Sequence, residues 1–190
     1  APVSRSAADL YEALAVADVQ EAADVLRPVH DETGGRDGFV SLEVAPRLAH
    51  DARGTIEEAR RLWRWVAREN AMVKVPGTPE GILATEVLTE DGVNVNVTLL
   101  FSLRAWEAAA AAFVAGLGKR AARGAEVSRV ASVASFFVSR IDTAVDGLLA
   151  ARLGGSGPAE RQVLESLAGK VAVANARLAY QRWGRIFDGP

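Results

Sequence analysis

Short apolar runs alternate along this chain with longer segments in which apolar residues recur every three or four positions. The short runs have the length and the β-branched content of strands, whereas the longer segments have the periodicity of amphipathic helices. Four strands are therefore predicted, at about residues 38–44, 71–78, 93–100 and 130–138. Helices are predicted in two segments within 1–36, from 55, from 78, from 102 to about 123, from 141 to 153 and from 159 to 187.

Several of the predicted helices begin with a recognisable cap. A Ser, Thr or Asp followed three residues later by an acidic residue can satisfy the first backbone N–H groups of a helix. This spacing occurs at Ser6 with Asp9, at Asp18 with Glu21 and at Thr55 with Glu58. Thr78 precedes Pro79, and proline is favoured at the first helical position.

Strands that alternate with helices in this way predict βαβ units and a parallel α/β sheet. The alternation of Asn94, Asn96 and Thr98 is unusual for a doubly wound sheet, whose strands are apolar on both faces. A polar stripe instead favours a barrel with one face toward its lumen. Because an eight-stranded (β/α)8 TIM barrel needs ~250 residues, four strands indicate a partial barrel.

We expect one partial-barrel domain over residues 1–190. Its parts are leading helices at 1–36, strands with the candidate site at 37–140 and following helices at 141–190.

Composition narrows the class of protein. Apolar residues make up 49% and charged residues 24% of the 190 residues, which are globular values. The net charge of −2 favours neither nucleic acid nor membranes as partners. The absence of cysteine excludes disulfides and thiolate metal sites. The sequence has no apolar run long enough for a membrane span and no apolar core of a signal peptide, so a cytoplasmic location is expected. It also lacks an initiator Met, which indicates a trimmed or incomplete chain.

Lys74 is the strongest indication of chemistry, because it lies within an apolar strand between Val73 and Val75. Lysine is seldom buried without a reason, and burial favours the uncharged amine, which is a nucleophile toward carbonyls. The alternative is a lysine that reaches water or pairs with a carboxylate.

Polar residues also occur near the ends of the other strands, where the chemistry of such barrels is found. They are Glu43, the same-face pair Asn96 and Thr98, Ser135 and Arg140. Together they would form a proton-transfer site around a nucleophilic lysine, with Arg140 placed for a phosphate. Taken singly, Glu43 could be a surface carboxylate, Asn96 could satisfy backbone groups, and Arg140 could pair with Asp142 or Asp146.

Four segments resemble those of transaldolases, particularly the longer bacterial type, and they occur in the same order. They are Val40–Val44, Val73–Thr78, Asn94–Ser102 and Ser135–Asp142. The Asn-Val-Thr-Leu-Leu-Phe-Ser run is the most specific, and the resemblance covers nearly the whole chain.

The resemblance implies a role for each candidate residue. Lys74 would form a Schiff base, and Glu43 with Thr98 would hold and activate the catalytic water. Asn96 and Ser135 would bind the substrate, and Arg140 would bind its phosphate. The reaction would move a dihydroxyacetone unit from sedoheptulose 7-phosphate to glyceraldehyde 3-phosphate in the pentose phosphate pathway, with no metal or cofactor.

The chain departs from the family pattern at both ends. The aspartate acid/base of the first barrel strand and the Thr-Ser-Asn-Pro segment of the second are absent, as are strands seven and eight. The chain therefore resembles strands three to six. Two alternatives stay open, a related Schiff-base sugar-phosphate aldolase and an inactive half-barrel whose free sheet edges would favour a homo-oligomer.

Overall fold

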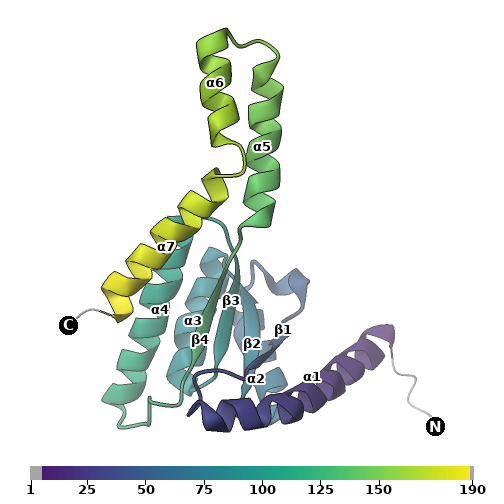
Figure 1. The fold of residues 1–190 in the computed structure, drawn as a ribbon. Helices are drawn as coiled ribbons and strands as arrows, with labels where there is room; N and C mark the ends of the chain where they lie inside the picture. Colours follow the sequence, from purple (N-terminus) through teal and green to yellow (C-terminus); the bar gives the residue numbers. More distant parts are fainter. Residues whose placement is uncertain (1–5, 189–190) are drawn as a thin grey trace. The chain divides into compact units, whose positions relative to one another are not determined.

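The computed structural model describes residues 6–188 and shows an α/β fold built on a parallel sheet (Figure 1). Four strands, seven α-helices and one short 3-10 helix occur in this part of the chain. In chain order they are α1 (Ala7–Glu32), β1 (Val40–Glu43), η1 (Pro46–Leu48), α2 (Ala52–Val66), β2 (Ala71–Pro76), α3 (Pro79–Asp91), β3 (Val95–Leu100), α4 (Leu103–Ala122), β4 (Ser132–Phe136), α5 (Ser139–Leu153), α6 (Pro158–Leu167) and α7 (Val171–Phe187). None of these helices is long and apolar enough to cross a membrane.

The strands lie in the order β1-β2-β3-β4, so each strand pairs with its neighbour in sequence. The pairs β1–β2 and β2–β3 are parallel, which confirms the sheet predicted from the strand and helix alternation. The register places Glu43 beside Lys74, and Lys74 beside Asn96. Three polar residues therefore form one row across three strands.

Helices α2 and α3 pack on β2 and lie together behind the sheet in Figure 1. The buried valines of β2 and β3 alternate with the polar row, so they occupy the opposite face of the sheet. Their exposed fractions are at most 2%, and the same holds for Leu62 of α2 and Leu88 of α3. Burial of these aliphatic side chains is the main force that holds the helices against the strands.

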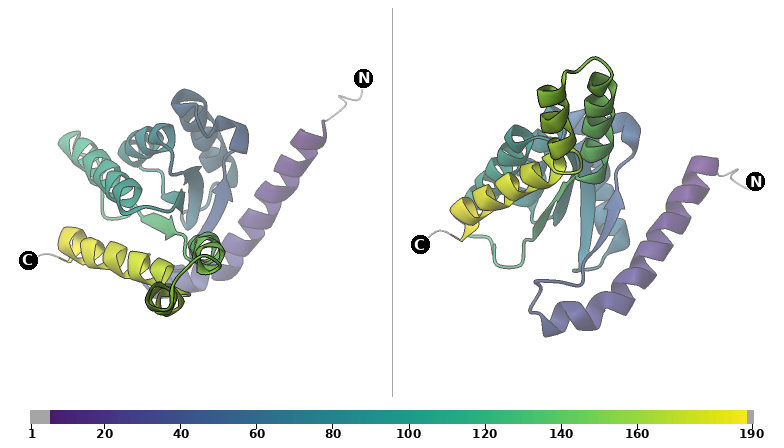
Figure 2. Two further views of the ribbon diagram at one scale, coloured as in Figure 1. Left: turned by 90° about the horizontal axis from the view of Figure 1, so that it is seen from above. Right: turned by 45° about the horizontal axis from the view of Figure 1, so that its top comes forward.

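Helix α1 lies at the end of the sheet where the strands begin (Figures 1 and 2). The prediction of two leading helices was wrong, since α1 is one helix of 26 residues that runs past Asp18 without a break. The capping box of Ser6 with Asp9 is confirmed. Ion pairs with α2 and with the segment before β2 hold the helix, through Glu12 with Arg61 and Asp24 with Arg68. These tertiary contacts favour one continuous helix over a break at the predicted cap, Asp18 with Glu21.

The start of α2 also differs from the prediction. The helix begins at Ala52, and Asp51 is the cap, accepting a hydrogen bond from the backbone N–H of Gly54. Thr55 lies within the first turn and donates its hydroxyl to the carbonyl of Leu48. By contrast, the predicted cap of α3 is confirmed, because Thr78 accepts from the backbone N–H of Gly81.

The last predicted helix is in fact two helices. Ala168 leaves the helical conformation with φ −56° and ψ 133°, and Gly169 follows with φ +68°. A positive φ is accessible to glycine at little cost, so the chain can turn between α6 and α7.

The contacts divide the chain into two compact units. The first comprises the described residues up to Thr98 together with Ala109–Ala134, and it contains β1, β2 and α1 to α3. The second comprises Leu99–Ala108 and the described residues from Ser135 on. The division passes through β3, α4 and β4.

Candidate functional site

The row of Glu43, Lys74 and Asn96 lies on the face of the sheet that α2 and α3 leave uncovered. The Nζ atom of Lys74 lies 3.5 Å from Oε2 of Glu43. The Lys74 side chain is 30% exposed, although its strand neighbours are buried. The lysine thus lies in a partly open position and pairs with a carboxylate, which was the alternative considered from sequence. Its partner, however, is another candidate site residue.

Asn96 is held by a residue that sequence reasoning missed. Its Nδ2 donates a hydrogen bond of 3.1 Å to Oγ of Ser41. Ser41 lies two residues before Glu43 on β1, so the two side chains share a face. The sequence predicts Asn96 and Thr98 on one face because they are two residues apart. The same two-residue spacing from Glu43 could have identified Ser41 in the sequence.

Thr98 lies two residues after Asn96 on β3, so the two side chains share a face, and it is level with Pro76 of β2. The residue is 1% exposed, and Oγ1 has no hydrogen-bond partner within residues 6–188. A buried hydroxyl without a partner is costly, on the order of 1–3 kcal/mol. Its position is therefore suited to hold a water molecule or a substrate oxygen.

Ser135 and Arg140 belong to the second unit. Ser135 is a partly buried residue of β4, and Arg140 lies in the first turn of α5, with its guanidinium 4.8 Å from the centre of the Phe137 ring. The two aspartates considered as partners for Arg140 accept hydrogen bonds from backbone N–H groups, Asp142 from Ala172 and Asp146 from Gly169. The structure thus brings Glu43, Lys74, Asn96 and Thr98 together within one unit and places the other two candidates in the other.

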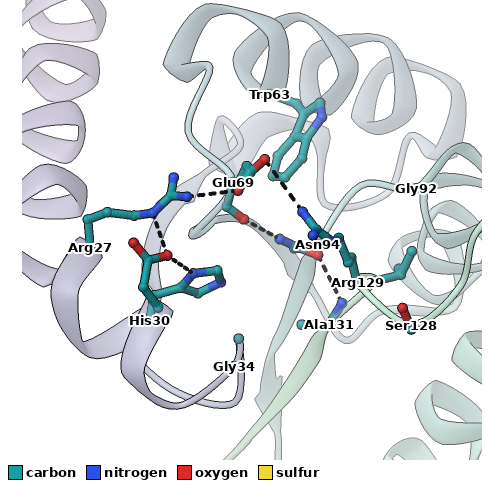
Figure 3. A pocket seen from close by; sticks show the side chains of 13 residues that line it. Arg27, His30, Gly34, Trp63, Glu69, Gly92, Asn94, Ser128, Arg129 and Ala131 are labelled. Carbon is teal, nitrogen blue, oxygen red and sulfur yellow. Dashed lines mark hydrogen bonds and ion pairs between the residues drawn. The ribbon is translucent and has the colours of Figure 1, made fainter.

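Asn94, the first residue of the polar stripe, has a structural role. Its Nδ2 donates to the backbone carbonyls of Glu69 and Ala71, and its Oδ1 accepts from the N–H of Ala131 (Figure 3). One side chain therefore joins the segments that lead into β2, β3 and β4. The polar alternation of Asn94, Asn96 and Thr98 thus combines this structural amide with two candidate site residues.

Asn94 also lines a hollow of about 530 Å³ at the end of the sheet where the strands begin (Figure 3). Arg27 donates to Asp31 and pairs with Glu69 across this hollow. The hydrogen bond from Arg27 lowers the pKa of Asp31. The positive charge of Arg27 is thus paired with the negative charges of Asp31 and Glu69. Within residues 6–188, no group of three His, Asp or Glu side chains is arranged to hold a metal ion.

The chemistry available to the polar row follows from its residue types. A primary amine can attack a carbonyl carbon, and a carboxylate at 3.5 Å can exchange protons with it. An amide and a hydroxyl on the next strand can bind substrate oxygens. This combination is suited to carbonyl chemistry through a covalent lysine adduct.

Comparison with known proteins identifies the family of this chain. The model of the transaldolase/fructose-6-phosphate aldolase family matches residues 3–187. A transaldolase of Thiobacillus denitrificans is 56% identical over 180 residues, covering 95% of this chain and 48% of that protein. Transaldolases of Neisseria gonorrhoeae and Trichodesmium erythraeum are 50% and 46% identical, covering 95% and 97% of this chain and 47% and 49% of their own lengths.

The chain therefore spans about half the length of the curated relatives it matches. The family match extends over almost all of the chain, from before α1 to the end of α7. This chain belongs to the transaldolase/fructose-6-phosphate aldolase family.

Proposed function

We propose that the complete protein that carries this chain is a transaldolase, and that Lys74 forms its Schiff base. The observation that carries this proposal is the row of Glu43, Lys74 and Asn96 on three paired strands, with the amine 3.5 Å from the carboxylate. The substrates would be sugar phosphates, with a dihydroxyacetone unit passing from sedoheptulose 7-phosphate to glyceraldehyde 3-phosphate.

The first step needs a neutral amine. Glu43 is close enough to accept a proton from Lys74, directly or through a water held with the buried hydroxyl of Thr98. The Nζ atom then attacks the ketose carbonyl carbon, and the carbonyl oxygen leaves as water after gaining two protons. The resulting imine can accept the electron pair of the carbon–carbon bond that breaks.

Cleavage of that bond needs a base on the neighbouring sugar hydroxyl, and it releases an aldose. In the family pattern this base is an aspartate on a first strand that is absent from this sequence. The enamine that remains on Lys74 attacks the acceptor aldehyde, and hydrolysis by the water at Glu43 and Thr98 frees the product and the lysine. Asn96 and Ser135 would bind substrate hydroxyls, and Arg140 would bind the phosphate.

The same proposal extends to the fold. A parallel sheet with polar residues on one face and α2 and α3 on the other fits the inner and outer surfaces of a (β/α)8 barrel. The chain would then supply strands three to six of one barrel domain, together with the helices that follow them.

A second candidate is a Schiff-base aldolase that ends the reaction with a proton in place of an acceptor aldose. The description of the matching family model, which names both activities, favours keeping it. An assay with and without acceptor aldehyde separates the two.

Borohydride trapping tests the covalent step. We expect the complete protein, treated with fructose 6-phosphate and borohydride, to carry a reduced adduct on Lys74 in peptide mass spectrometry. The other two lysines of this 190-residue sequence provide internal controls, Lys119 in its ion pair with Glu86 and Lys170 before α7. A label on either one, or labelling that persists in Lys74→Arg, would reject the assignment.

A further inference from the structure

We propose that Ser41 is a positioning residue, which orients the Asn96 amide beside Lys74 by accepting its hydrogen bond. This inference rests on the proposed function, because Asn96 matters to the reaction only if Lys74 forms the Schiff base. Ser41 itself is not assigned any contact with the substrate.

The register of the sheet shows where the hydrogen bond from Asn96 to Ser41 lies relative to Lys74. Ser41 on β1 is level with Met72 of β2, whereas Asn96 on β3 is level with Lys74. Since β2 lies between β1 and β3, the 3.1 Å hydrogen bond from Asn96 to Ser41 crosses β2 on the amino-terminal side of Lys74. The bond therefore bounds the space around the lysine on that side.

The burial pattern agrees with this arrangement. Met72 and Lys74 are two residues apart, so their side chains share a face. Met72 is 2% exposed, whereas the Lys74 side chain is 30% exposed. The change from a closed to an open face thus falls between these two residues, where the Ser41–Asn96 bond crosses.

The bond has a clear physical consequence for the amide. An asparagine side chain rotates about two bonds, and on a partly open face water competes for its N–H groups. A fixed acceptor on β1 selects one orientation of the amide plane before substrate arrives. Pre-organisation of this kind lowers the barrier because the group need not reorient in the transition state.

A double-mutant cycle tests whether Ser41 acts through Asn96. In the complete protein we expect Ser41→Ala to lower kcat by about five- to tenfold, the effect of one net hydrogen bond. In an Asn96→Ala background the same change should have no further effect. Ser41→Thr, which keeps the hydroxyl, should restore most of the rate. Ser132→Ala is the matched control, because the hydroxyl of that serine donates to the backbone carbonyl of Val95.

The side-chain amide of Asn96 offers a measurement that does not depend on turnover. In ¹⁵N NMR spectra of the free protein, Ser41→Ala should shift the Asn96 NH₂ signals and speed their exchange with water, whereas Ser132→Ala should leave that exchange rate unchanged. Additive effects in the kinetic cycle, or unchanged Asn96 signals, would overturn the assignment of Ser41. An unsubstituted protein with neither turnover nor trapping at Lys74 would overturn the proposed function, and the amide signals would still decide whether Ser41 orients Asn96.

Discussion

At the scale of single residues, the environment of Lys74 is set by neighbours on two other strands. Glu43 lies beside it in the register with β1, and Asn96 lies beside it in the register with β3. Parallel pairing keeps register partners on one face, so an amine, a carboxylate and an amide converge without any loop having to hold them. A site built on strands is more rigid than one built on loops.

Glu43→Gln should slow turnover far more than it weakens substrate binding. The amide keeps the shape and hydrogen bonding of the carboxylate but cannot accept a proton, and a positioned acid–base group contributes typically ~10²–10⁴-fold to rate. Steady-state kinetics of the complete protein give kcat and KM separately. An unchanged kcat would exclude Glu43 from proton transfer.

Arg140→Ala should raise KM for phosphorylated sugars and barely affect unphosphorylated dihydroxyacetone. A guanidinium binds phosphate oxygens through two parallel N–H donors, an interaction that alanine cannot replace. The measurement is a comparison of KM for the two substrates. Because the guanidinium also stacks on Phe137, Arg140→Leu serves as a control that keeps apolar contact with the ring. Equal losses for both substrates would indicate a structural role.

At the scale of elements, helix ends show how local signals compete with tertiary contacts. Thr55 with Glu58 has the spacing of a capping box, yet the helix begins earlier, at Ala52, with Asp51 as its cap. The hydroxyl of Thr55 is buried and bonds to Leu48 instead, so packing against η1 decides its partner. Thr78 is the true cap of α3, where the local signal and the fold agree.

Helix packing gives an element-scale prediction at Gly116 of α4. A Cβ there would lie 2.5 Å from the carbonyl oxygen of Glu86 and 2.6 Å from Cβ of Thr89, both in α3. Gly116→Ala should therefore lower the free energy of unfolding by about 1–3 kcal/mol, as overpacking does. Thermal or urea denaturation measures this change.

Gly118 provides the matched control in the same helix, since a Cβ at that position meets nothing within 4 Å. Gly118→Ala should stabilise the protein by up to about 1 kcal/mol through helix propensity. Equal effects of the two substitutions would show that α4 does not pack closely on α3 at Gly116.

At the scale of the whole molecule, the sheet of residues 6–188 ends at β1 on one side and β4 on the other. The chain also covers only 47–49% of three transaldolases that it matches. The proposed aspartate base would therefore lie in sequence outside these 190 residues. Pairing partners for the two sheet edges would lie there as well. Unpaired edges favour association between chains.

We expect the 190-residue chain by itself to have very low transaldolase activity. Catalysis requires groups held within fractions of an ångström, and the proposed base on the sugar hydroxyl would lie on a first barrel strand that this sequence lacks. A coupled assay on the 190-residue chain and on the complete protein, side by side, provides the comparison. Similar kcat/KM values for the two would mean that residues within this chain supply the base.

The sequence by itself determined the α/β class, the strand that carries Lys74, the cap at Thr78 and the candidates Glu43, Asn96 and Thr98. These features depend on local spacing, which a linear pattern contains. Only the tertiary structure decided the Ser41–Asn96 bond, the partial exposure of Lys74 and the continuity of α1 past Asp18. Each of these depends on which distant segments lie side by side, and register between strands is set by packing across the whole sheet.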